Sequence, residues 1–200
     1  MRDSRFVFVD VDTQRDFLEP SGALFVPGSD EILQNLSRLT HFARERGIPI
    51  LATACAHTLD EVDPEPFPPH CLVGTLGQER IDATHWPGSV VLKANHAIAP
   101  GSAVVPHLTL HKTRYDIFSR PDADAIIEIY GRNSPTFVVY GVATDYCVRA
   151  AVLGLCDRGH KVMVVVDAVR AIDVEREADQ FREFIDRGAI LTLTDDVVEP

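Results

Sequence analysis

Six short runs of apolar and β-branched residues, separated by amphipathic segments, constrain the fold of this chain more than any other feature. A run in which successive side chains are all apolar is typical of a strand that is buried on both faces, as in a parallel sheet. The segment LTLHK at 108–112 is a further candidate strand. The six runs lie at 6–11, 49–54, 90–93, 136–141, 161–168 and 189–193.

Amphipathic segments between these runs have the spacing of helices. Each of the four is followed or closed by glycine, which is common at helix C-termini. Alternating strands and helices predict an α/β fold, a three-layer α/β/α domain with a mostly parallel central sheet, in which ligands bind at the carboxyl ends of the strands. The predicted helices are 29–46, 123–130, 144–158 and 174–187.

The length of the chain predicts a single domain spanning residues 1–200. With 46% hydrophobic residues, 200 residues can bury a sizeable core. The region from about 59 to 108 contains most of the prolines and several histidines. We interpret it as a long loop region over the active-site edge of the sheet, not as a second domain.

The charge balance excludes several classes of partner. Nineteen basic and thirty acidic residues give a net charge of −11, which repels nucleic acid and anionic membranes and favours a small-molecule partner. The N-terminal segment is too short and too charged for a signal peptide. Four cysteines without secretory features indicate free thiols in a cytoplasmic protein.

Three residues lie where parallel strands are expected to end. Asp12 follows the first run and could serve as a general base, or could simply cap a loop. Cys147 follows the fourth predicted run, with Thr144 as the candidate N-cap of a helix whose amides and dipole would favour a thiolate; a small packing cysteine is the alternative. Lys112 could hold the base ionised, and Lys93 is a competitor for that role.

Histidines and cysteines occur together at two places in the chain. The fragments are Cys55-Ala56-His57 and His70-Cys71. Imidazole, thiolate and carboxylate groups are all ligands for Zn²⁺, although this spacing matches no zinc finger and loop histidines are often only surface residues. The acidic residues of the intervening loop include Asp63 and Glu65.

Four motifs together resemble a known family. They are DTQRDF at 12–17, HCLVGTLG at 70–77, the segment from Lys112 to Phe118, and GVATDYCV at 141–148. With them, nearly the whole chain is similar to the isochorismatase-like cysteine hydrolases, and most to the nicotinamidases.

The resemblance implies a catalytic triad and an oxyanion hole. The triad is Asp12, Lys112 and Cys147, with Lys112 preferred over Lys93 because aromatic residues follow it. A non-proline cis peptide between Val142 and Ala143 would direct the amides of Ala143 and Cys147 at an oxyanion.

The resemblance also implies a substrate pocket and a metal site. The aromatic walls would come from Phe17, Phe67, Tyr115 and Phe118. Nicotinamidases hold a metal with an Asp-x-His pair and further histidines. Here His57 and His70 match, whereas Cys55 replaces the aspartate. A divalent ion (Zn, Fe or Mn) would therefore need Cys55, Asp63 or Glu65 as a third ligand, or the metal is lost.

The expected activity is a cysteine-dependent amidase that converts a small carboxamide to acid and ammonia through a thioester. Nicotinamide is the first expected substrate. One alternative is a metal-free amidase of the same superfamily that acts on another small amide or carbamoyl compound. An alternative of another class is a catalytically silent binding or scaffold domain. Members of the family often form homo-oligomers, which we expect here as well.

Overall fold

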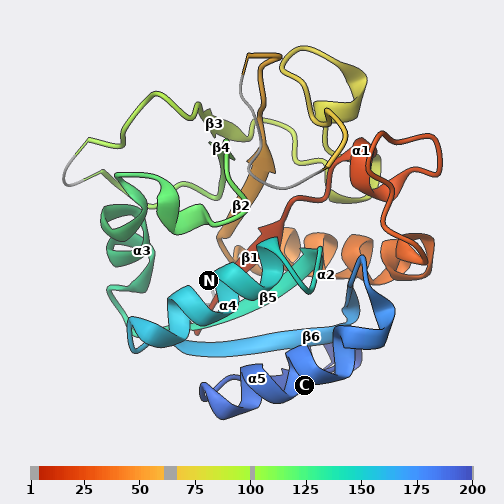
Figure 1. Ribbon diagram of the computed structural model, residues 1–200. Helices are drawn as coiled ribbons and strands as arrows, with labels where there is room; N and C mark the ends of the chain where they lie inside the picture. The colour runs from red at the N-terminus through yellow and green to blue at the C-terminus, as the bar shows by residue number, and fades with distance from the viewer. Residues whose placement is uncertain (1–4, 61–66, 100–101, 200) are drawn as a thin grey trace.

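A seven-stranded sheet forms the centre of the molecule (Figure 1), in a computed structural model that describes residues 5–60, 67–99 and 102–199. The strand order is β3-β4-β2-β1-β5-β6-β7, and every neighbouring pair is parallel. The predicted α/β class with a parallel sheet is confirmed. The strands are β1 (Phe6–Val11), β2 (Ile50–Cys55), β3 (Val90–Leu92), β4 (His107–Lys112), β5 (Thr136–Val142), β6 (Lys161–Arg170) and β7 (Ile190–Thr192).

Helices cover both faces of this sheet and complete three layers (Figure 1). Alternate residues of β1 point to opposite faces: Val9 packs in the core beneath α4, and Phe8 packs with Leu36 and Leu39 of α2 on the other face. Helix α5 packs beside α4 and β7, and α6 packs against α2 and β6. The helices are α1 (Arg15–Leu18), α2 (Leu33–Arg46), α3 (Ala123–Gly131), α4 (Cys147–Asp157), α5 (Glu177–Asp186) and α6 (Thr194–Val198).

Three predicted helices begin differently in the structure. The segments predicted at 29–46 and 174–187 each start with a short 3₁₀ turn before α2 and α5 begin. The helix predicted from Thr144 begins only at Cys147. Thr144 is not its N-cap, because the Thr144 hydroxyl donates to Glu177 Oε1 at 3.3 Å instead. Asp145 accepts the backbone N–H groups of Ile172 and Asp173.

The two outermost strands correct the prediction that every apolar run is buried on both faces. Val90 and Val91 of β3 are about half exposed, and Ile190 of β7 is more exposed still. Both strands lie at an edge of the sheet and have a neighbour on one side only.

The region 59–108, predicted as a long loop region, also contains regular structure. Strand β3 and two 3₁₀ turns, Leu76–Gln78 and Asp82–Thr84, lie within it.

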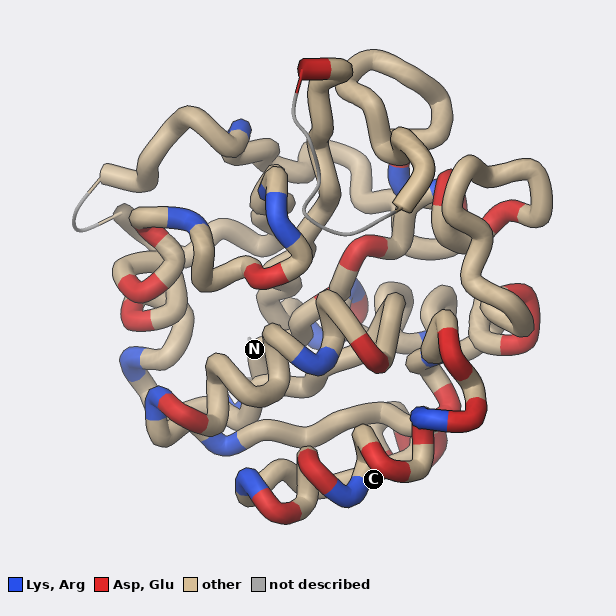
Figure 2. The backbone as a smooth tube through the Cα atoms, in the orientation of Figure 1, with Lys and Arg blue, Asp and Glu red and all other residues tan. Residues whose placement is uncertain are grey.

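The charged residues are distributed around the whole molecule (Figure 2). Lys and Arg of the described chain are spread among Asp and Glu, and α5 contains four acidic residues and one arginine. No helix within the described ranges has both the length and the apolar character that crossing a membrane requires.

The carboxyl ends of the central strands β4, β2, β1 and β5 lie side by side and form what we call the carboxyl edge of the sheet. Cys55 at the end of β2 pairs in register with Lys112 at the end of β4. Val11 at the end of β1 pairs with Gly141 of β5. This register brings together the residues that follow these strands, including Asp12.

Candidate active site

A buried ion pair between Asp12 and Lys112 lies at the centre of this edge. Lys112 Nζ is 2.7 Å from Asp12 Oδ2, and both side chains are at most 1% exposed. The other carboxylate oxygen, Oδ1, accepts a hydrogen bond from the Thr53 hydroxyl at 2.6 Å. Lys93, the alternative lysine, is exposed on the loop after β3. The structure therefore places Lys112, not Lys93, beside Asp12.

Cys147 is the first residue of α4 and points at the same lysine. Lys112 Nζ donates to Cys147 Sγ at 3.5 Å, and the Cys147 thiol also hydrogen-bonds the Asp12 carboxylate. The three members of the predicted triad are thus in mutual contact.

A second cysteine, Cys55, belongs to the same cluster. Lys112 Nζ donates to Cys55 Sγ at 3.1 Å, and Cys55 Sγ lies 3.7 Å from Asp12 Oδ2. The sulfur atoms of Cys55 and Cys147 and a carboxylate oxygen of Asp12 all lie within 4.8 Å of one another. The sequence predicts Cys55 only as a possible metal ligand. The parallel register of Cys55 with Lys112 is the signal that could have placed it here.

The protonation of the cluster differs from the simple expectation of a Cys147 thiolate. The hydrogen bond to Cys55, burial and the nearby Asp12 carboxylate raise the pKa of Cys147 well above its ordinary value. The hydrogen bond from Cys147 lowers the pKa of Cys55 well below its ordinary value, against burial and with the help of Lys112. Because its pKa is raised, Cys147 rests as the neutral thiol.

Asp12 and Lys112 have shifted pKa values as well. Burial, with a contribution from Cys55, raises the pKa of Asp12 more than Lys112 lowers it. Burial alone would lower the pKa of Lys112, but the Asp12 carboxylate and the two sulfur atoms raise it well above its ordinary value. Lys112 therefore remains a cation, and the Asp12 carboxylate has an increased proton affinity.

The turn between β5 and α4 brings Ala143 beside Cys147. The peptide bond between Val142 and Ala143 is cis. The Ala143 carbonyl accepts the N–H groups of Tyr146 and Val148 at 3.1 and 3.0 Å, which fixes the turn against the start of the helix. Ala143 and Cys147 both line the cavity described next.

A small cavity of about 40 Å³ lies in front of Cys147. Phe17, Phe67 and Tyr115 line it, as the resemblance implies, together with Tyr146, which the sequence analysis did not name. The Phe67 and Tyr146 rings meet edge to face at 5.2 Å between centroids. Leu24 and Ile172 are further lining residues that sequence reasoning missed.

Phe118 does not belong to this cavity, contrary to the expectation. Its ring packs against α4, where the Arg158 guanidinium lies 3.7 Å from the ring centroid. Gly154 of α4 leaves room for it, since a Cβ there would lie 2.2 Å from the Phe118 ring. The 3₁₀ turn Ile117–Ser119 turns this side chain away from the sheet edge, where Tyr115 remains.

The two expected histidine ligands lie side by side at the cavity. The rings of His57 and His70 are 4.7 Å apart between centroids. Ligand atoms of Cys55, His57 and His70 lie within 4.8 Å of one another, and all three side chains are buried. His57 Nε2 is buried with no hydrogen-bond partner among the described residues. Asp63 and Glu65, also named as possible ligands, lie outside the described residues.

The DTQRDF segment holds the surrounding loops in place. Gln14 clamps the end of β2, because its side chain accepts the Cys55 N–H at 2.7 Å and donates to the Cys55 carbonyl at 2.8 Å. Asp16 accepts the Cys71 N–H at 2.6 Å, which holds the loop beside His70. Asp12, Gln14 and Asp16 of the motif thus each have a structural or chemical partner at the site.

A cysteine at a helix start, beside a buried lysine and aspartate at the carboxyl edge of a parallel sheet, is typical of a cysteine hydrolase of the α/β class. The chain belongs to the isochorismatase family, whose domain model matches residues 6–196.

The chain is also similar to several known proteins, among them nicotinamidases and a pyrazinamidase. Nicotinamidase of Escherichia coli strain K12 is 27% identical over 213 residues, with 92% of this chain and 93% of the relative covered. The pyrazinamidase of Pyrococcus horikoshii, solved in complex with zinc, is 30% identical with a TM-score of 0.74, and 94% of this chain and 99% of that chain are covered. A probable inactive nicotinamidase of Arabidopsis thaliana is 25% identical, with 82% of this chain and 80% of the relative covered. The resemblance to nicotinamidases is confirmed.

Proposed function

We propose that this protein is an amide C–N hydrolase that releases ammonia from a small carboxamide through a thioester on Cys147. The observation that carries the proposal is the contact of Cys147 with both Asp12 and Lys112 at the wall of a cavity. Relatives named as nicotinamidases support the amide as substrate class.

We propose a task for each member of the cluster. Asp12, with its raised pKa, accepts the Cys147 proton, and the sulfur attacks the amide carbon. The amides of Ala143 and Cys147 would stabilise the oxyanion, and protonated Asp12 then donates its proton to the amide nitrogen, which leaves as ammonia. Asp12 next deprotonates a water molecule, which attacks the thioester. The C–S bond breaks to give the acid, and the proton returns from Asp12 to the Cys147 sulfur. Lys112 remains charged throughout and holds Asp12 in place.

Nicotinamide is the first proposed substrate. Phe17, Phe67, Tyr115 and Tyr146 give the cavity aromatic walls that suit a flat ring. Two relatives of this chain are named nicotinamidase.

The size of the cavity supports a second candidate, a smaller amide or carbamoyl compound. Its volume of about 40 Å³ is well below the ~150 Å³ of a cavity that accommodates benzene. A pyridine ring would enter only if Phe67 and Tyr146 moved apart, whereas a short aliphatic amide needs less displacement.

The residues present fit a divalent metal. A buried, unpartnered His57 nitrogen beside His70 and the Cys55 sulfur is the donor set of a zinc site. We therefore propose Cys55, His57 and His70 as its ligands. When bound, the metal would supply a Lewis-acid contact for the ring nitrogen of a pyridine carboxamide. Asp12, Lys112 and Cys147 would perform the acyl transfer.

A catalytically silent binding domain is the alternative of another class. One relative is named a probable inactive nicotinamidase, so this alternative has to be weighed. A silent protein has no need of the Asp12, Lys112 and Cys147 contacts, all of which are present here.

Cytoplasmic location and a homo-oligomer remain expectations. Light scattering on the purified protein tests the oligomeric state.

The deciding experiment measures ammonia release from nicotinamide and from a series of small aliphatic amides, with wild type and Cys147→Ala. We expect wild-type turnover with one of these substrates and a loss of at least about a thousandfold in the variant, because the nucleophile is removed. Cys156→Ala, on the same helix but outside the cavity, is the matched control and should retain turnover. Wild-type turnover in Cys147→Ala would refute the mechanism, and no turnover with any amide would favour the silent domain.

A further inference from the structure

A second, larger cavity lies against β2 and β4 and shares no lining residue with the cavity at Cys147. Its volume is about 700 Å³. The floor is formed by β2 and β4, where Ala54 and His111 point to the face opposite their neighbours Cys55 and Lys112. The walls come from the loop that contains Arg80 and from the segment around Trp86. We call this cavity the Arg80 groove.

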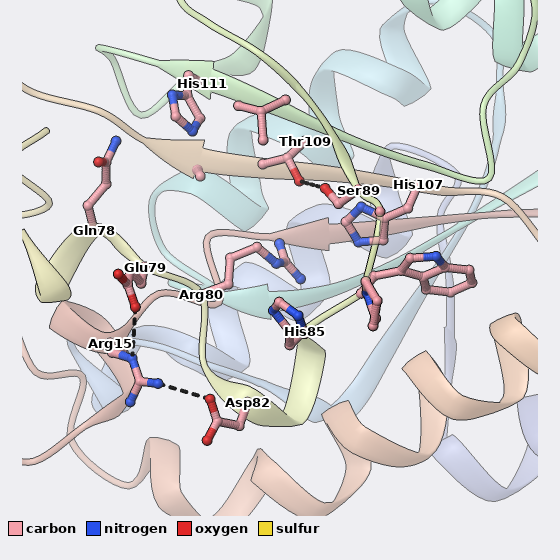
Figure 3. A pocket seen from close by; sticks show the side chains of 15 residues that line it. Arg15, Gln78, Glu79, Arg80, Asp82, His85, Ser89, His107, Thr109 and His111 are labelled. Carbon is pink, nitrogen blue, oxygen red and sulfur yellow. Dashed lines mark hydrogen bonds and ion pairs between the residues drawn. The ribbon is translucent and has the colours of Figure 1, made fainter. Parts of the chain in front are cut away.

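Polar side chains converge on the middle of the Arg80 groove. Figure 3 shows Arg80, His85 and His107 directed toward one another. His107 is 2% exposed, and neither of its ring nitrogens has a hydrogen-bond partner among the described residues. Arg80 donates to Asp10 through Nη2, whereas its Nε and Nη1 atoms are buried without a partner in the described chain. Unpartnered buried polar groups are rare in folded proteins and indicate a missing partner.

The unpartnered groups are mostly donors. Arg80 offers Nε–H and Nη1–H, the Gln78 side-chain amide nitrogen is also unpartnered, and a neutral His107 offers one N–H and one acceptor nitrogen. A ligand that satisfies them must therefore be rich in oxygen acceptors.

The electrostatic environment of the groove favours a negative charge. Burial, with the positive charges of Arg80 and Arg44 and the proximity of His85, lowers the pKa of His107 to about 3. The same cations act on any ligand that enters. The two carboxylates that line the groove, Glu79 and Asp82, lie at one end, where both approach Arg15 (Figure 3).

Trp86 adds an apolar surface to these donors. Its ring lies 5.4 Å from that of His107, and the Arg44 guanidinium lies 5.0 Å from its centroid. Ser89 and Thr109, whose hydroxyls are 3.2 Å apart, complete the polar lining on this side.

We propose that the Arg80 groove is a second ligand site, which binds a small molecule through a carboxylate or phosphate group held by Arg80 and His107. This site is independent of the proposed amidase activity, since it uses none of the residues of the Cys147 cavity.

The chain provides its own probe, because Trp86 is its single tryptophan. We would titrate the full-length protein with inorganic phosphate and, separately, with acetate, and follow the Trp86 fluorescence and the melting temperature. Sodium chloride at matched ionic strength is the control. The expected result is a saturable change in both signals with at least one of the two anions and none with chloride. Saturation by phosphate alone identifies a phosphate ligand, and saturation by acetate alone a carboxylate.

Two variants locate the binding. His107→Phe keeps a ring of similar size but removes both nitrogens, and should weaken binding about tenfold or more, as expected for a lost hydrogen bond to a charged group. The double variant Arg80→Gln, Asp10→Asn removes the cation together with its buried partner and should abolish saturation. His41→Phe and Arg182→Gln make the same changes at exposed positions and should bind as wild type does.

The proposal is overturned if neither anion gives a saturable signal with wild type. It is equally overturned if both groove variants fold, as judged by circular dichroism, and still bind with wild-type affinity.

Discussion

Lys112 is the residue on which the geometry of the cluster depends. Its Nζ contacts Asp12 at 2.7 Å, Cys55 at 3.1 Å and Cys147 at 3.5 Å. Without this cation, the buried Asp12 carboxylate would lose its main stabilising charge. The pKa of Asp12 would then rise further, and Asp12 would be protonated, and unable to act as a base, at a higher pH.

We therefore predict that Lys112→Met lowers kcat at neutral pH by at least about a hundredfold and shifts the acidic limb of the pH–rate profile upward. Lys93→Met, at an exposed lysine of the neighbouring loop, should leave both unchanged. Steady-state rates between about pH 5 and 9 measure this, with circular dichroism as the check of folding. An unshifted profile in an active Lys112→Met enzyme would contradict the role assigned to this lysine.

Cys55 connects the acyl-transfer cluster to the candidate metal site. Its sulfur approaches Lys112 and also lies within 4.8 Å of the His57 and His70 ligand atoms. If Cys55 is a thiolate ligand, cobalt substitution should produce a sulfur-to-metal charge-transfer absorption in the near ultraviolet.

We predict that Cys55→Ser removes this absorption and weakens zinc binding about tenfold or more, whereas Cys156→Ser changes neither. Absorption spectra and a competitive chelator titration provide the readouts, and neither depends on turnover. If the band persists in Cys55→Ser and disappears in Cys147→Ala, the metal is bound at the Asp12, Cys55 and Cys147 group instead.

Among the elements, the junction of β5 with α4 is the most constrained. Gly141 has φ +116°, and a Cβ there would lie 2.0 Å from the Val11 carbonyl oxygen of β1. Asp12 directly follows Val11, so any displacement of β1 moves the proposed base.

Gly141→Ala should therefore destabilise the protein by about 3 kcal/mol or more and also lower turnover, since it adds a steric clash to the left-handed backbone. Gly159→Ala, also at positive φ but with no atom within 4 Å, should cost only about 1 kcal/mol. Urea unfolding of both variants measures the difference. Equal destabilisation would show that the close approach to Val11 is not what requires glycine.

At the scale of the whole molecule, one sheet contains both the first and the last strand of the described chain. We therefore expect a single cooperative unfolding transition, whose free energy depends on pH through buried histidine. The folded-state pKa of His107 is about 3, below the ~6.5 of an unfolded histidine. Its contribution to stability is therefore complete above about pH 6.5 and is lost as the pH falls toward 3.

We predict that His107 accounts for about 2.5 kcal/mol of lost stability between about pH 7 and 4.5. The measurement is urea unfolding of wild type and His107→Phe at both pH values, because the difference between their pH slopes isolates this residue. Buried Asp10 and Asp12, whose pKa values are raised, act in the opposite direction in both proteins and cancel. Identical slopes would contradict the assignment.

The sequence by itself determined the layers and selected the members of the proposed triad. Apolar runs separated by amphipathic segments predict a parallel sheet with helices on both faces, and parallel strands place their carboxyl ends at one edge. Asp12, Lys112 and Cys147 each stand where a strand ends or a helix begins, so pattern and motif were sufficient to select them.

Only the tertiary structure decided which residues share that edge and which face away. The register of β2 with β4 places Cys55 beside Lys112, and the turn after Lys112 directs Phe118 onto α4 while Tyr115 stays at the cavity. The Arg80 groove likewise combines loop residues with the face of β4. Local patterns show where a strand lies in the sequence and which of its side chains share a face, but not which strand pairs with it. Contacts between residues far apart in the sequence depend on that pairing.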